Sequence, residues 1–119
     1  MGELSQVRTA LDDIKKMEHV TDVSLVSRGG MYIMGGPPKG VHRETFSAMS
    51  AIIFGAAETT STEMKDKLVK VVLELSEQKL CLLNVGQKYL LIVSVDKEGD
   101  VEKISMGADE TISKVESVL

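Results

Sequence analysis

The sequence predicts an α/β domain of the α+β type, in which helices sandwich a five-stranded antiparallel sheet in the order α-β-β-α-β-β-β-α. Three segments repeat apolar residues at helical spacing, and five shorter segments alternate them or run them continuously, as strands do. Short turns join the strands within each group, which favours hairpins and antiparallel pairing. At 119 residues the chain is predicted to form one domain, residues 1–119.

The first helix is predicted over residues 4–18, with one face on the sheet. Its apolar stripe has steps of three or four residues and consists of Leu4, Val7, Leu11, Ile14 and Met17. We expect a break at residues 19–22 and strands at 23–27 and 31–34. A glycine pair lies between these two strands, and glycine accepts the positive φ that a hairpin turn requires.

The central helix is predicted to begin near His42 and to end between Thr59 and Asp66. Phe46, Met49 and Ile53 fall on one face of it, and small residues fill most of the rest. No charged residue occurs between Thr45 and Ala57, so the helix has no solvated face there and must be covered on both sides. Because so short a chain cannot easily cover both, we expect a second copy to cover one. The alternative is a helix wholly inside the monomer.

The second strand group is predicted at residues 67–75, 79–85 and 88–96. The last of these is apolar on both faces, which is typical of a central strand covered on each side. A closing amphipathic helix follows. Its apolar positions are Val101, Ile104, Ala108, Ile112, Val115 and Leu119. We expect the first and last helices on one face of the sheet and the central helix on the other.

The amino-acid composition argues against several classes of function. A net charge of -4, without a Lys/Arg run among aromatics, argues against nucleic-acid binding. The apolar runs are too short to insert into a membrane, and no leader-like apolar segment is apparent. One cysteine, Cys81, excludes an internal disulfide and fits the cytoplasm. An aromatic content of 3% weighs mildly against a ligand-stacking pocket.

No catalytic or cofactor motif stands out. The glycine pairs lack the Lys-Ser/Thr that a phosphate-binding loop requires. Cys81 lies in an apolar strand, which favours packing over nucleophilic chemistry with His19 or His42. These three residues are too few and too irregularly spaced for a metal site. We therefore expect no catalytic residue, no cofactor and no metal. The carboxylates of the central helix are expected to be solvated.

The chain resembles the roadblock family, also called the dynein light-chain roadblock family. The resemblance covers nearly the whole chain and rests on the element order, the segment LDDIKKMEHV before DVSLVSRGGMYI, the small-residue helix, and the strands ending LNVGQKYLLIVSVDKEG. Gly29, Gly30, Gly86 and Gly99 stand where the family pattern has glycine. The loop at residues 35–40, with two prolines, departs from that pattern, so a partner surface built from it would differ.

The resemblance implies a homodimer in which central helices pack together and the following strands pair into one continuous sheet. Stand-alone prokaryotic members regulate Ras-like small GTPases, so it also implies a regulator, either GTPase-activating or scaffolding, that is not an enzyme. The expected dimer interface consists of Phe46, Met49, Ser50, Ile53, Ala57, Val69, Val71 and Leu73. The alternative function is a small-ligand sensor with a pocket between helix and sheet.

Overall fold

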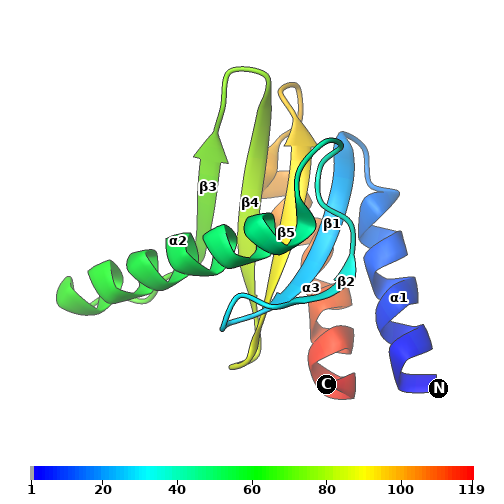
Figure 1. Ribbon diagram of the computed structural model, residues 1–119, viewed down its shortest axis with the longest axis horizontal. Coiled ribbons are helices and arrows are strands. Elements are labelled where there is room, and N and C mark those ends of the chain that lie inside the picture. Colours follow the sequence, from blue (N-terminus) through cyan, green and yellow to red (C-terminus); the bar gives the residue numbers. More distant parts are fainter. Residues whose placement is uncertain (1) are drawn as a thin grey trace.

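The computed structural model describes residues 2–119 and has the predicted element order. The elements are α1 (Gly2–Lys15), β1 (Val20–Ser27), β2 (Tyr32–Gly35), α2 (Arg43–Glu63), β3 (Lys70–Glu74), β4 (Gln78–Val85), β5 (Tyr89–Asp96) and α3 (Val101–Val118). The strands form one sheet in the order β2-β1-β5-β4-β3, and every neighbouring pair is antiparallel. In Figure 1, α2 crosses the front of the sheet, α3 lies behind it and α1 lies beside β1. Helices α1 and α3 share one core and α2 covers the other, which confirms the predicted sandwich.

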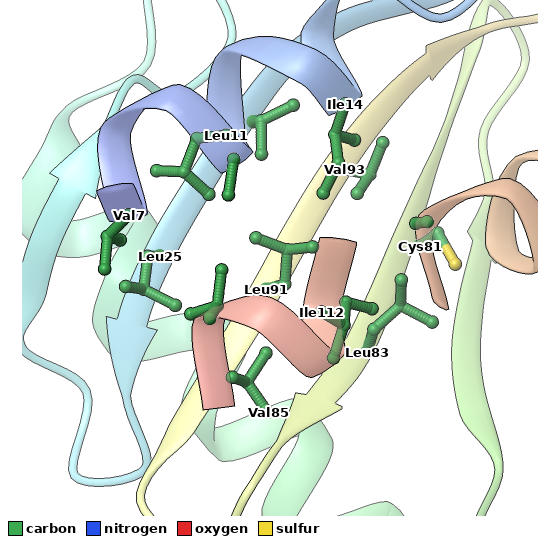
Figure 2. Close-up of a cluster of buried hydrophobic side chains, with 14 of the residues drawn as sticks. Val7, Leu11, Ile14, Leu25, Cys81, Leu83, Val85, Leu91, Val93 and Ile112 are labelled. Atoms are coloured by element: carbon green, nitrogen blue, oxygen red, sulfur yellow. The ribbon is translucent and has the colours of Figure 1, made fainter. Parts of the chain in front are cut away.

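The sheet separates two hydrophobic cores of unequal size. The larger core lies under α1 and α3, where Leu11, Leu91 and Ile112 are among the side chains that meet (Figure 2). The smaller core lies under α2. Its buried members are Val26, Phe54, Leu82, Leu90 and Ile92. Strand β5 supplies alternate residues to both cores, which is why its sequence is continuously apolar.

The main error of the sequence interpretation is the break at residues 19–22, since β1 already begins at Val20. Val20 pairs with Val95, and the register then shifts before Asp22 pairs with Ser94. Such an irregularity disturbs the apolar alternation by which a strand is recognised. The chain turns one residue earlier, at His19, whose φ is 73°.

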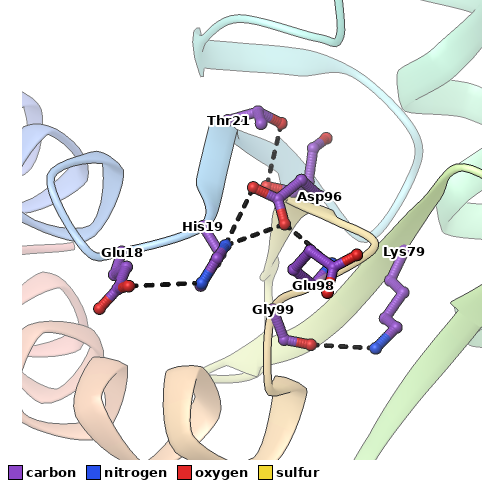
Figure 3. Close-up of polar contacts among 8 residues, drawn as sticks. Glu18, His19, Thr21, Lys79, Asp96, Glu98 and Gly99 are labelled. Carbon is purple, nitrogen blue, oxygen red and sulfur yellow. Dashed lines mark hydrogen bonds and ion pairs between the residues drawn. The ribbon is translucent and has the colours of Figure 1, made fainter.

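The turn at His19 is held by a cluster of polar contacts at the end of β5 (Figure 3). His19 Nδ1 lies 3.0 and 3.1 Å from the two carboxylate oxygens of Asp96, and Nε2 lies 3.4 Å from Glu18. The Asp96 amide donates to the His19 carbonyl at 2.9 Å. A β-carbon on Gly99 would lie 2.9 Å from the His19 β-carbon, so the next turn approaches too closely for a side chain. These contacts join the start of β1 to the start of α3.

Hydrogen bonding between the two side chains moves both pKa values. The Asp96 carboxylate raises the pKa of His19 above its ordinary 6.5. The imidazole in turn lowers the pKa of Asp96 below its ordinary 3.8. A raised histidine pKa stabilises the fold fully below pH 6.5 and ceases to do so as the pH rises through the folded value. A lowered aspartate pKa stabilises the fold above pH 3.8 and ceases to do so as the pH falls through the folded value.

We therefore expect His19→Asn to destabilise the protein most between about pH 4 and 6.5, and progressively less above that range. Asparagine tolerates positive φ, so the substitution removes the imidazole without adding backbone strain. The measurement is urea unfolding of both proteins across pH. His42→Asn, at a histidine remote in sequence from this cluster, is the control. A pH-independent difference for His19→Asn would contradict the pairing.

Candidate binding surface

Helix α2 packs on the sheet through a face of small residues around one large one. Ser47, Ser50 and Phe54 are buried, and the Ser47 hydroxyl donates to the Arg43 carbonyl at 2.9 Å. The sequence suggested Phe46, Met49 and Ile53 as the main apolar face, but that stripe lies to one side of the face that meets the sheet. Short side chains bring the helix backbone close to the strands, and Phe54 fills the remaining space at 1% exposure.

A turn of this same chain accounts for some of the small residues in α2. A β-carbon on Gly30 would lie 3.1 Å from the α-carbon of Ala48 and 3.6 Å from the β-carbon of Ala51. The turn between β1 and β2 therefore closes one flank of the helix. The sequence argument assigned such small residues to a second copy, whereas on this flank they accommodate the hairpin. The opposite flank, with Phe46 and Ile53, has no such cover and both residues are half-buried.

Arg28, at the end of β1, fixes α2 over the sheet. Its guanidinium forms an ion pair with Glu58 of α2 and donates to the side-chain oxygen of Asn84 in β4. The same group lies over the Phe54 ring, 5.0 Å from the centroid. The Arg28 amide also donates to the Lys88 carbonyl at 2.8 Å. One side chain thus links the helix to β1 and β4, and its positive charge is paired with Glu58 of the same domain.

The outer face of α2 remains apolar and exposed. The apolar side chains of Met49 and Ile52 are 50% and 61% exposed to solvent. In Figure 1 the C-terminal part of α2 extends past β3, the last strand of the sheet on that side. Val69, just before β3, is 75% exposed. We call Met49 and Ile52, together with the open edge of β3, the α2–β3 surface.

The eight predicted interface residues differ in their exposure. Met49 and Val69 are exposed. Ser50 is only 3% exposed and packs against the sheet of its own chain, so it has little area left for a partner. The others are half-buried: Phe46, Ile53, Ala57, Val71 and Leu73. The sequence interpretation did not assign Ile52 to the interface. It lies opposite Phe54, which becomes apparent only from the burial of Ser47, Ser50 and Phe54 in the structure.

Comparison with known proteins identifies the architecture. A model of the Roadblock/LC7 domain matches residues 6–94. The chain belongs to the Roadblock/LC7 family. Its fold is also that of the gliding protein MglB from Thermus thermophilus, with a TM-score of 0.87, 13% identity, and coverage of 99% of this chain and 91% of that one. No curated protein sequence matches significantly.

Two further solved structures share the roadblock fold. MglB from Myxococcus xanthus has a TM-score of 0.86 and 14% identity, covering 96% of this chain and 94% of that one. A Roadblock/LC7 domain from Streptomyces avermitilis has a TM-score of 0.76 and 18% identity, covering 92% and 91%. At such identities the likeness concerns the fold, which confirms the resemblance noted in the sequence.

In this roadblock domain, the cysteine and the two histidines considered for catalysis take part in packing, helix capping or side-chain pairing. Cys81 is fully buried in the larger core, where desolvation raises the pKa of its thiol to about 11 despite nearby Lys70. His42 caps α2 by accepting the Thr45 amide at 3.3 Å, and His19 pairs with Asp96. Within residues 2–119 no three His, Cys, Asp or Glu side chains gather as a metal site would require. No helix in the described part of the chain is long and apolar enough to cross a membrane.

Burial of the only thiol gives a direct test of the packing. We expect iodoacetamide to modify Cys81 at least about a hundredfold more slowly in the native protein than in urea, because the buried thiol is neutral and inaccessible. Mass spectrometry of a single adduct over time measures this. Rapid modification of the native protein, at the rate of a free cysteine, would show that β4 is open to solvent.

Proposed function

We propose that this roadblock domain is a non-enzymatic homodimer that regulates or scaffolds a Ras-like small GTPase. The observation that carries the proposal is the α2–β3 surface, which combines an exposed apolar helix face with an unpaired strand edge. A single chain leaves both open. Membership of the Roadblock/LC7 family supports the class of partner, since the resemblance seen in the sequence implies a regulator of Ras-like GTPases.

We expect a second copy to bind at the α2–β3 surface. Its own helix and strand edge can cover the exposed helix face and pair with the open edge of β3. The outer edge of β3 has backbone N–H and C=O groups without a strand partner, since the sheet ends there. Antiparallel pairing with a second β3 would satisfy them and bring the two α2 helices together above the joined sheet. Such an interface is isologous, as in most homodimers. A related MglB structure described as a tetrameric arrangement supports self-association in this fold.

A regulatory mechanism without a donated catalytic group fits the three arginines of this chain. Arg8 lies in α1, on the other face of the sheet from the α2–β3 surface. Arg28 is committed to Glu58 and Asn84. Arg43 pairs with Glu44 at 3.0 Å and lies 4.3 Å from the Tyr32 ring centroid. We therefore propose that the domain acts on the switch loops of a GTPase by shape and apolar contact rather than through an arginine finger.

The alternative of a ligand pocket between α2 and the sheet is less well supported. Phe54 is 1% exposed, and Leu82 and Leu90 beneath the helix are fully buried. These side chains fill the layer in which a ligand would have to lie. Binding of a partner to the outer face requires no such space.

We expect Met49→Glu to weaken self-association by at least about a hundredfold, because a dimer would bury the new charge without a partner. The variant should still fold, since Met49 is half exposed in the single chain. Light scattering across protein concentration measures the mass. Leu4→Glu, at a 58% exposed apolar residue of α1, is the matched control and should leave the mass unchanged. An unaltered dimer for Met49→Glu would refute pairing through α2.

The GTPase proposal predicts a complex that depends on the bound nucleotide. Purified domain is mixed with small Ras-like GTPases carrying GDP or a non-hydrolysable GTP analogue, and the mass of the complex is measured by light scattering. We expect binding to one nucleotide state and its loss in Ile52→Lys. Because Ile52 is 61% exposed and belongs to the surface proposed for self-association, the mass of this variant alone is measured first to establish that it remains a dimer. Equal binding to both states would support scaffolding alone. Unchanged binding of Ile52→Lys would exclude this face.

A further inference from the structure

A second open surface lies on the opposite side of the sheet from α2. A groove of about 540 Å³ runs between α3 and the strands β3 and β4. Val69, Lys70 and Leu83 line it on the strand side, and Glu102, Met106 and Asp109 line it on the helix side. The established fold and the proposed GTPase interaction leave this groove unused.

The groove lies where α1 and α3 leave part of the sheet uncovered. In Figure 1, α3 lies behind the strands nearer β1 and β5, α1 lies beside β1, and no helix of residues 2–119 lies behind β3. Val72 pairs with Cys81, a residue of the larger core, so its side chain is on this rear face. It is 41% exposed, and Met106 on the facing side of α3 is 72% exposed. The place beside α3 therefore exposes apolar side chains from both the strand and the helix.

Most of the carboxylates of α3 lie on the groove side of the helix, and the fourth, Glu110, pairs with Lys114 at 3.9 Å away from it. Three carboxylates line the groove, those of Glu102, Asp109 and Glu116, at intervals of seven residues. The two lysines of the helix lie elsewhere, Lys114 in the cleft beside α1 and Lys103 in the pocket near His19. Seven residues are about two helical turns, or roughly 10 Å, so the carboxylates form a row along the helix.

Two of the three carboxylates already have partners within the domain. Glu102 pairs with Lys70 at 2.6 Å, and Glu116 accepts the Gly86 amide at 3.1 Å. No ion pair to Asp109 occurs within residues 2–119, and Lys70 is the one cation among the groove residues. The groove thus combines apolar side chains, among them Leu83 and Met106, with a surplus of negative charge along its helix side.

We propose that this groove binds an amphipathic basic helix of a partner protein. Apolar residues of that helix would cover Val72 and Met106, and a lysine or arginine would meet Asp109. The row from Glu102 to Glu116 is about 21 Å long, which matches about four turns of a bound helix lying along α3. The groove lies on the face of the sheet away from α2, so the two partners would bind to different faces.

The test uses a synthetic acetylated helix of about sixteen residues, with lysines every seven positions and leucine and alanine between them. A matched peptide carries glutamate in place of lysine. Fluorescence anisotropy measures affinity for the full chain, and amide chemical shifts locate the bound peptide. We expect saturable binding of the lysine peptide alone, with shifts in residues 69–72 and 102–116.

Variants separate specific docking from general attraction to an acidic protein. Asp109→Lys should weaken binding about tenfold, because one attraction becomes a repulsion. Met106→Gln should weaken it about fivefold through lost apolar contact. Asp12→Lys changes the net charge equally on exposed α1 and should have less than about a twofold effect. Circular dichroism of each variant verifies that it is folded.

Three results would overturn the proposal: equal weakening by Asp109→Lys and Asp12→Lys, equal binding of the glutamate peptide, or no saturable binding. The outcome is independent of the proposed GTPase function. Peptide binding is tested with variants of α3, whereas self-association and GTPase binding are tested with variants of α2. Failure of either proposal therefore leaves the other measurable.

Discussion

Strand β5 imposes the constraint on which the rest of the fold depends. It lies in the middle of the sheet between β1 and β4, and its apolar residues point to both faces. Leu90 and Ile92 require cover on one side, while Leu91 and Val93 require it on the other. A strand of this kind is stable only between two layers. The placement of α2 opposite α1 and α3 follows from this one segment.

Much of this architecture could be predicted from local patterns. The helical spacing of apolar residues such as Val7, Leu11 and Ile14 predicts a helix with one face packed on the sheet. These side chains are buried as expected. The start of β1 was missed because the register irregularity near Val20 interrupts the pattern. Such an irregularity depends on the partner strand β5, which lies far along the chain, and a single sequence does not reveal it.

The candidate surface was harder to predict than the fold. Sequence alone could not distinguish small residues that admit a turn from those that admit a second molecule. Gly30 against Ala48 is a contact within the chain, and Ser50 is buried by the sheet. The role of Arg28 was equally inaccessible, since Glu58 and Asn84 are distant in sequence and meet it only after folding. Exposure of Ile52 becomes clear only when the inner face of α2 is known.

The unequal cores have a consequence for how the domain opens. Helix α2 is held by a small cluster around Phe54 and by the polar contacts of Arg28, whereas α1 and α3 share a much larger cluster. Segments with few buried contacts unfold locally at a lower free energy than the core does. We therefore expect α2 to open locally at a lower free energy than the rear helices, at a cost set by exposing Leu90 and Ile92 of the sheet. Amide hydrogen exchange in α2 would then follow this partial opening rather than complete unfolding.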